Sequence, residues 1–159
     1  MEGLQLSKCY LTERESEFML AALDLANEAK SLGEVPVGAV IVKDGEIISR
    51  GINRRETANN ALAHAEIEAI DGACKSLGGW RLDGCEMYVT LEPCPMCAGA
   101  IINARLDRVV YGASDAKAGS VGSVFDMFEL PYNHHPKVKS GAMCEECAKL
   151  LSDFFGQLR

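Results

Sequence analysis

Long apolar runs are missing from this 159-residue sequence, and none approaches the roughly 20 residues that a membrane-spanning helix needs. The first residues (MEGLQLSKCYLTERESEF) carry acidic side chains and lack the apolar segment of a secretory signal peptide, so we expect a cytoplasmic protein without membrane spans. Internal repeats, linkers and low-complexity runs are also lacking. These absences predict a single domain over residues 1–159, which is long enough to bury a core.

Positive charge is scarce, because 16 Lys and Arg residues face 23 Asp and Glu residues and leave a formal net charge of −7. That balance argues weakly against a polyanionic partner, although it leaves room for a local basic surface. The seven cysteines are an odd number, which fits a reducing compartment better than a disulfide framework. The remaining composition, 48% apolar and 25% charged, excludes the disordered and membrane classes.

Two of the cysteines, Cys94 and Cys97, stand three residues apart after an apolar run and are flanked by prolines. Proline is tolerated in the first turn of a helix, so this stretch predicts a helix start. Residues three apart share one helical face, and the free amide groups of a helix start favour thiolates, so the two sulfurs can bind one ion. A Cys-x-x-Cys pair alone is also found in redox pairs and in structural zinc sites.

His64 and Glu66 open another expected helix in the sequence His-Ala-Glu. His-x-Glu followed by Pro-Cys-x-x-Cys is the signature of zinc deaminases that act on nucleobases. We therefore expect His64, Cys94 and Cys97 to bind one Zn²⁺ per subunit and to leave a fourth position for water, as catalytic zinc sites do. Glu66 is the expected catalytic residue, which moves protons between water, ring nitrogen and leaving ammonia. Because they stand two residues apart, His64 and Glu66 can serve one site only if it lies off the helix end.

A structural Cys₄ zinc site is the alternative, with Cys144 and Cys147 joining the first cysteine pair. The separation between the two pairs is much longer than the roughly 15–20 residues of a compact zinc ribbon. Such a site would also leave His-Ala-Glu without a role. We expect instead that Cys144 and Cys147 stand at the start of the last helix, with Cys147 facing inward.

The expected elements alternate in a way that is typical of an α/β protein. Asp44-Gly45 between β-branched runs at 37–43 and 46–52 predicts a hairpin with a type I′ turn. Helices are expected over 13–32, 63–77, 95–105, 124–130 and 143–158, and further strands over 86–91, 108–113 and 137–139. The strand–helix–strand order implies parallel pairing. The fold class is thus a single three-layer α/β domain, with a mixed central sheet of about five strands and helices on both faces.

Apolar residues at helical spacing predict the buried faces of three of these helices. The first helix is also expected to begin with a capping box formed by Thr12 and Glu15 and to end at Gly33. The buried faces are expected at Phe18, Ala22, Leu25, Ala29 and Leu32, at Ile67, Ile70, Cys74 and Leu77, and at Cys147, Leu150, Leu151, Phe154 and Phe155.

Four stretches resemble the bacterial tRNA-specific adenosine deaminases, the TadA family of the cytidine-deaminase-like superfamily: His-Ala-Glu, TLEPCPMCAGA, RVVYGASDAKAGSVGS and ECAKLLSDFF. The resemblance runs over about residues 21–155. It implies a cytidine-deaminase-like fold and the conversion of adenosine to inosine at the wobble position of a tRNA anticodon by a zinc-dependent homodimer. It also implies that Asn53 contacts the target purine and that Asp115 contacts the ribose side of the flipped nucleotide or its neighbour.

The RNA partner is expected to be a tRNA anticodon stem-loop, whose bases can be splayed out for recognition. Further residues are expected near the substrate: Ala65, Arg54, Arg55, Lys117, Phe154, Phe155 and Arg159, with at least one of the two phenylalanines in the core. The chain stops at Arg159 without the Lys/Arg-rich tail of many relatives, so we expect weaker and more salt-sensitive RNA binding.

Two other functions remain open at this point. A free nucleobase deaminase of the guanine or cytosine type is one, because guanine deaminases share the Glu-Pro-Cys-Pro-Met-Cys run. A non-catalytic zinc subunit that only binds RNA or a protein is the other, and the presence of Glu66 argues against it.

Overall fold

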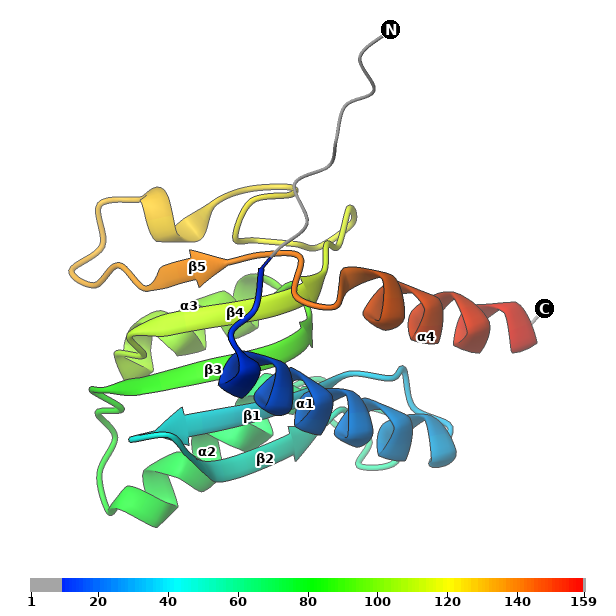
Figure 1. The fold of residues 1–159 in the computed structure, drawn as a ribbon, viewed down its shortest axis with the longest axis horizontal. Coiled ribbons are helices and arrows are strands. Elements are labelled where there is room, and N and C mark those ends of the chain that lie inside the picture. The colour runs from blue at the N-terminus through cyan, green and yellow to red at the C-terminus, as the bar shows by residue number, and fades with distance from the viewer. Residues whose placement is uncertain (1–9, 159) are drawn as a thin grey trace, which may run out of the picture.

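The computed structural model describes residues 10–158, whose middle layer is a five-stranded sheet (Figure 1). The strands are β1 (Gly38–Lys43), β2 (Glu46–Ile52), β3 (Cys85–Leu91), β4 (Arg108–Ala113) and β5 (Lys137–Lys139), in the order β2-β1-β3-β4-β5. β1 pairs antiparallel with β2 and β3, whereas β3, β4 and β5 run parallel to one another. The expected mixed sheet is therefore confirmed.

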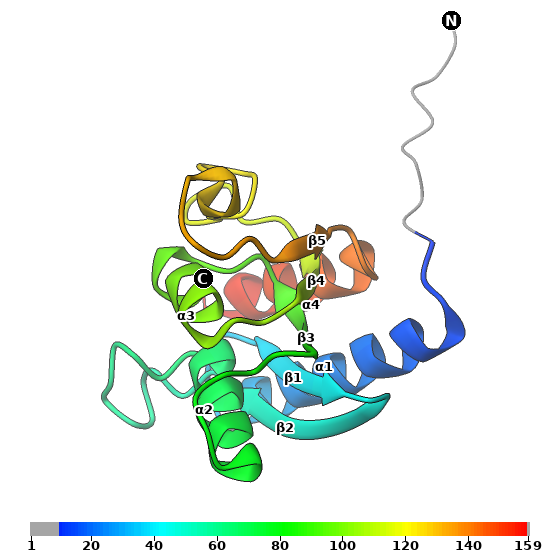
Figure 2. The ribbon, with the colours of Figure 1, turned by 90° about the vertical axis from the view of Figure 1, so that its left-hand side faces the viewer.

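Two pairs of helices cover the two faces of this sheet, as the views in Figures 1 and 2 show. α1 (Glu13–Ser31) and α4 (Cys144–Gln157) lie on one face, and α2 (Ala65–Leu77) and α3 (Pro95–Ala104) lie on the other. Alternate residues of β1 enter two separate cores, Ala39 and Ile41 under α2 and α3, and Val40 and Val42 under α1. Within the described part of the chain, no helix is long and apolar enough to cross a membrane.

The local signals at the start of the chain are confirmed. Thr12 accepts from the backbone N–H of Glu15, and the Glu15 carboxylate accepts from that of Thr12, so the capping box is complete. Asp44 and Gly45 have φ values of 51° and 77°, which a type I′ hairpin turn requires. This turn joins the end of β1 to the start of β2, so the start of β1 and the end of β2 lie together at the opposite end of the sheet.

The expected buried face of α2 is right only in part. Ile70 and Cys74 are partly buried and pack against the core, but Ile67 is not among the residues packed there and Leu77 is exposed. The fully buried residues of this helix are Ala65, Glu66, Ala69 and Ala73. The reason is the close approach of α2 to β2: a Cβ atom on Gly51 would overlap the carbonyl oxygen of Ala65. Only small side chains fit between a helix and a strand at that distance, so Ala65, Ala69 and Ala73 occupy the contact and the bulkier Ile70 packs at its side.

Other corrections concern segment 124–130 and two exposed apolar residues. The expected helix over 124–130 is only a 3-10 turn at Met127–Glu129, in which Glu129 N–H donates to Asp126 and Leu130 N–H donates to Met127. The start of the segment is bonded to the preceding loop, since Val124 N–H donates to Gly119 and Met127 N–H to Ser120. Leu32 and Phe155 are each 46% exposed, while Cys147 and Phe154 are buried as expected. The ends of α1 and α4 project beyond the sheet, so the outer turns have less to pack against (Figure 1).

Candidate metal centre and its pocket

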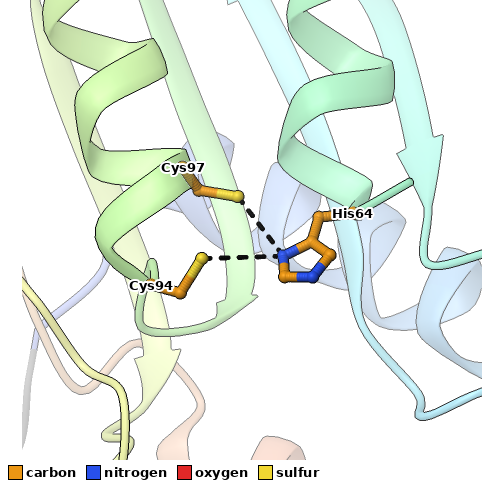
Figure 3. Close-up of side chains that lie close together, drawn as sticks. All are labelled: His64, Cys94 and Cys97. Atoms are coloured by element: carbon orange, nitrogen blue, oxygen red, sulfur yellow. Dashed lines mark hydrogen bonds between the residues drawn. The ribbon is translucent and has the colours of Figure 1, made fainter. Parts of the chain in front are cut away.

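His64 and Cys94 occupy equivalent places, since each is the residue that caps the start of a helix on the same face of the sheet. Both have extended backbone angles, φ −86° for His64 and φ −75° for Cys94, and neither side chain makes a capping hydrogen bond. Cys97 follows in the first turn of α3, which begins with Pro95. The three side chains converge off the two helix ends, as Figure 3 shows. The expectation of a site beyond the helix end is thus matched by the geometry.

The three side chains form a cluster that could hold a metal ion. Their ligand atoms all lie within 4.8 Å of one another, and Nδ1 of His64 lies 3.6 Å from the Cys94 sulfur and 3.5 Å from the Cys97 sulfur. Among the described residues this is the one such group, and Cys144 is exposed while Cys147 is buried under α4 on the opposite face. The cysteines of α4 therefore lie apart from this cluster, which removes the geometric basis of the Cys₄ alternative.

Electrostatics prepare the cluster for a cation. The Cys97 thiol donates to the Cys94 sulfur, and this hydrogen bond, with help from His64, lowers the pKa of Cys94 to about 4. The same hydrogen bond together with burial raises the pKa of Cys97. The bond to Cys94 raises the pKa of His64 as well. One thiolate is thus ready at neutral pH, and a divalent cation can displace the proton that the two sulfurs share.

Glu66 lies in the first turn of α2, 4% exposed, and faces the same pocket as His64. Burial raises the pKa of its carboxyl group to about 7, and the negative charge of Cys94 acts in the same direction. A carboxyl group with a pKa near neutrality can both accept and return a proton under physiological conditions. Glu66 is not a member of the metal-binding group, so its carboxylate is available for proton transfer.

A pocket of about 210 Å³ opens beside the cluster, at the carboxyl ends of β3 and β4. Its walls combine apolar side chains with a few polar groups, and they comprise Val35, Val37, Asn53, Arg55, His64, Ala65, Glu66, Leu91, Glu92, Cys94, Asp115 and Ala118. Small, largely apolar pockets with a few convergent polar groups are typical of sites for flat organic rings.

The structure brings together some of the expected substrate residues and not others. Asn53, Arg55, Ala65 and Asp115 line the pocket, whereas Arg159 lies outside the described residues. Lys117 is exposed beside Ala118, and it lines a neighbouring groove instead, together with Phe125 and Tyr132.

Arg54 and Phe154 also lie outside the pocket walls. The Arg54 guanidinium donates to Glu68 at 2.9 Å, and so part of its charge is already paired. Phe154 is 8% exposed and packs edge-on against Phe155, which makes Phe154 the core member of that pair.

Two buried carboxylates that frame the pocket were missed by sequence reasoning. Glu34 is fully buried and accepts from the backbone N–H groups of Glu56 and Thr57, so it fixes the loop after β2. Glu92 is 1% exposed and accepts hydrogen bonds from the loop after β4. Burial alone would raise the pKa values of both groups, but their hydrogen-bond donors lower them. The only sequence signal for either residue was its place: Glu92 stands between an apolar strand and a proline, and Glu34 stands two residues before a proline.

The Asn53 side chain is held at the pocket wall by two hydrogen bonds. Its amide nitrogen donates to the carbonyl oxygen of Val35 at 3.2 Å, and its amide oxygen accepts from the backbone N–H of Arg55 at 3.2 Å. These bonds fix the orientation of the amide group.

Comparison with known proteins gives consistent results. The family model described as MafB19-like deaminase matches residues 13–159. The tRNA-specific adenosine deaminase of Bacillus subtilis (strain 168) is 51% identical over 143 residues, which cover 89% of each chain. The protein of the same name from Haemophilus influenzae is 46% identical over 150 residues, covering 93% of this chain and 87% of that one.

Solved structures agree with this fold. A structure from work on A-to-I editing by tRNA:A34 deaminases at the wobble position of transfer RNA has a TM-score of 0.83 at 49% identity and covers 86% of this chain and 99% of that chain. A guanine deaminase from Bacillus subtilis has a TM-score of 0.62 at 42% identity and covers 79% of this chain and 82% of that chain. The expected cytidine-deaminase-like fold is confirmed by the first of these matches.

Proposed function

Since this chain belongs to the MafB19-like deaminase family and, within it, to the tRNA-specific adenosine deaminases, we propose that it deaminates adenosine to inosine at the wobble position of a tRNA anticodon. The observation that carries the proposal is the joint presence in one pocket of the His64, Cys94 and Cys97 cluster and the buried Glu66 carboxylate. The reaction is hydrolytic: water replaces the exocyclic amine of adenine, and ammonia leaves.

Zinc is the ion we propose for the cluster, one per subunit. The ligand set of one imidazole and two thiolates is a type that zinc prefers. Bond lengths of about 2.0 Å to nitrogen and about 2.3 Å to sulfur in a tetrahedral site place the two ligand atoms about 3.5 Å apart. The separations of 3.6 Å and 3.5 Å between His64 Nδ1 and the two sulfurs support this ion. Zinc bound there would supply Lewis-acid activation of the attacking water.

Glu66 is the proposed proton-transfer group. Its carboxylate accepts a proton from the attacking water and transfers it to the ring nitrogen next to the reacting carbon. It then accepts the second proton, from the hydroxyl group now on that carbon, and transfers it to the amine, which leaves as ammonia while the carbonyl group forms. The first turn of α2 brings His64 and Glu66 to the same pocket, so water and base meet without a change in the fold. Burial keeps bulk water away from this exchange.

The pocket walls suit a purine. Apolar contacts from Val35, Val37 and Leu91 can cover the flat faces of the ring, while Asn53 presents a fixed amide. Ala65 lies beside the zinc ligand His64, and we propose that it contacts the reacting edge of the base. Asp115 is proposed to contact the ribose side of the flipped nucleotide.

The tRNA is proposed to bind through the anticodon stem-loop, with the target base splayed out. Lys117 and Arg54 are proposed to contact phosphates, and a cytoplasmic location follows from the tRNA substrate. For the C-terminal aromatic pair, the exposure of Phe155 makes it the better candidate for an RNA contact than the buried Phe154 that we expected.

A homodimer is also proposed. Ile67 is only partly buried and Leu77 is exposed, and these two apolar residues of α2 support a second copy as the covering surface.

The test is direct. The zinc-loaded protein is incubated with an unmodified tRNA that carries a wobble adenosine, and inosine is scored, with guanine and free adenosine as parallel substrates. We expect inosine in the tRNA and much slower turnover of both small molecules. Guanine turnover with unchanged tRNA would identify a free-base deaminase instead, the candidate favoured by the 42% identical guanine deaminase structure.

The matched control is Glu66→Ala. It should keep its zinc and its fold but lose about 10²–10⁴-fold in rate, which is the usual contribution of a positioned proton-transfer group. Near-normal turnover of zinc-loaded Glu66→Ala would contradict the role of this carboxylate.

A further inference from the structure

Glu92 lies at the point where β3 ends, two residues before Cys94, and its side chain turns away from solvent. Its own backbone N–H donates to Ala113 at 2.8 Å, which fastens it to the end of β4. The carboxylate faces the loop of residues 114–123, which we call the β4 loop. This loop supplies Asp115 and Ala118 to one wall of the pocket.

The carboxylate is the hydrogen-bond centre of the β4 loop. It accepts from the backbone N–H of Asp115 at 3.1 Å, from that of Val121 at 3.3 Å and from that of Ser123 at 3.1 Å. The Ser123 hydroxyl donates to it as well. Four donors from both ends of the loop therefore meet on one buried group. A carboxylate can satisfy such a set because both of its oxygens accept hydrogen bonds.

The loop is also shaped around this group. A Cβ atom on Gly119 would overlap the Glu92 carboxylate, so the chain passes directly over it. Ser120 N–H donates to the carbonyl oxygen of Pro93 at 2.9 Å, which adds a second tie to the segment that leads into α3. The Asp115 carboxylate in turn accepts hydrogen bonds from the backbone N–H groups of Lys117 and Ala118, and these bonds close the turn at the pocket wall.

We propose that Glu92 is a positioning residue for deamination: its buried carboxylate holds the β4 loop in the conformation that presents Asp115 and Ala118 to the bound nucleotide. This inference rests on the proposed function. Glu92 also lines the pocket, but its carboxylate is bonded to the loop, and we assign it no contact with the reacting atoms or the metal cluster. Misplacement of a pocket wall by about 1 Å can cost about 100-fold in rate, so the effect is measurable.

The experiment compares Glu92→Gln with Glu15→Gln. Glu15 is a suitable control because it is also a buried, multiply bonded carboxylate, but it contacts Arg108 and Lys139 at the other end of β4. Metal content, hydrogen exchange of residues 115–123, and kcat and tRNA affinity on a wobble-adenosine tRNA are measured for both variants and for the wild type.

We expect Glu92→Gln to keep its metal, to lose exchange protection in the β4 loop, and to lose about 100-fold in kcat. An amide replaces one acceptor oxygen by a donor, which then faces loop N–H groups. Affinity for tRNA should change much less, because phosphate contacts supply most of it. Glu15→Gln should be less stable than the wild type yet retain its kcat and its loop protection.

Gly119→Ala provides a second route, since its Cβ atom would overlap the Glu92 carboxylate and force the loop away from it without changing the chemistry of Glu92. It should reproduce the kcat loss even if Glu92→Gln fails to fold. Wild-type kcat in a variant whose loop exchanges freely would overturn the proposal, and so would a loss of activity that follows loss of metal. If the wild type deaminates guanine and not tRNA, the proposed function fails, and the same comparison on guanine still decides the role of Glu92.

Discussion

Cys94 and Cys97 share one helical turn but differ in their surroundings, because Cys94 is half-buried and Cys97 is fully buried. Burial of a thiolate is unfavourable unless a positive charge lies next to it, so the inner sulfur depends most on the bound cation. The same reasoning explains why the proton shared by the two sulfurs rests on Cys97.

Replacement of the inner ligand should therefore empty the site. Cys97→Ala leaves two protein ligands, and we expect the purified protein to lose most of its zinc. Metal analysis against Cys144→Ala, which removes an exposed cysteine of α4, is the measurement. Retention of zinc by Cys97→Ala, or its loss from Cys144→Ala, would contradict the assigned ligands.

At the residue scale, the sequence predicts the role of a side chain when the residues that act with it stand only a few positions away. His64, Glu66, Cys94 and Cys97 fall into this class, because short spacings place them at two helix starts. Glu92 does not, since its donors on Asp115 and Ser123 stand 23 and 31 residues away. A buried carboxylate is recognised only when its partners are known.

The packing of α2 against β2 decides where His64 stands. Gly51 permits contact between the strand and Ala65, the residue that follows His64. On the opposite face, Gly38 permits the same contact between β1 and α1, at the carbonyl oxygen of Ala22. The two glycines thus make the same kind of contact, but only the helix packed on Gly51 begins at a residue of the metal cluster.

This difference gives a prediction for paired variants. Gly51→Ala and Gly38→Ala should each destabilise the protein by about 1–3 kcal/mol, which is usual for overpacking of a closed contact. Only Gly51→Ala should also weaken zinc binding, because it displaces the helix that begins at His64. Denaturant unfolding and competition with a zinc chelator measure the two effects. Equal zinc affinity of the two variants would refute the link between this contact and the site.

Element types follow from the sequence more readily than element faces do. The capping box of α1, the Asp44-Gly45 turn and the order of strands are local or follow from chain order. The buried face of α2 depends instead on the distance between helix and sheet, which a glycine in another element sets. The segment 124–130 likewise bonds to the β4 loop, and its own apolar pattern does not contain that information.

Across the whole molecule, charge is arranged at two opposite ends of the sheet. The pocket occupies the end with the carboxyl termini of β3 and β4. The other end holds a partly buried ionic network, in which the buried Glu15 pairs with Arg108 at 2.8 Å and with Lys139 at 3.0 Å. Burial alone would raise the pKa of Glu15, but the Thr12 N–H and these two cations lower it to about 2.

A lowered carboxyl pKa makes stability depend on pH. The contribution of Glu15 is present above its ordinary value of 4.5 and is lost as the pH falls from there towards 2. The loss amounts to about 3 kcal/mol at most. Unfolding free energies at pH 6 and pH 3 should therefore differ more for the wild type than for Glu15→Gln. Parallel pH profiles for the two proteins would count against this network.

The net charge of −7 makes single cations near the pocket important for RNA binding. Lys117→Ala should weaken tRNA binding and make the plot of log affinity against log salt concentration shallower by about one unit or less. Lys75→Ala is the control, since Lys75 stands at the far end of α2 and pairs with Asp71 at 2.7 Å. Identical slopes for both variants and the wild type would exclude Lys117 as a phosphate contact.

The proposed zinc ion would join two helix starts, and this has a consequence for the folding of the chain. His64 and Cys94 are 30 residues apart, and that interval contains all of α2 and β3. In the unfolded chain, closing such a loop costs conformational entropy, so the ligands bind a metal well only after these elements have docked. The rate at which the protein releases zinc to a coloured indicator should therefore measure how fast the starts of α2 and α3 separate, which is the rate of local unfolding at this site.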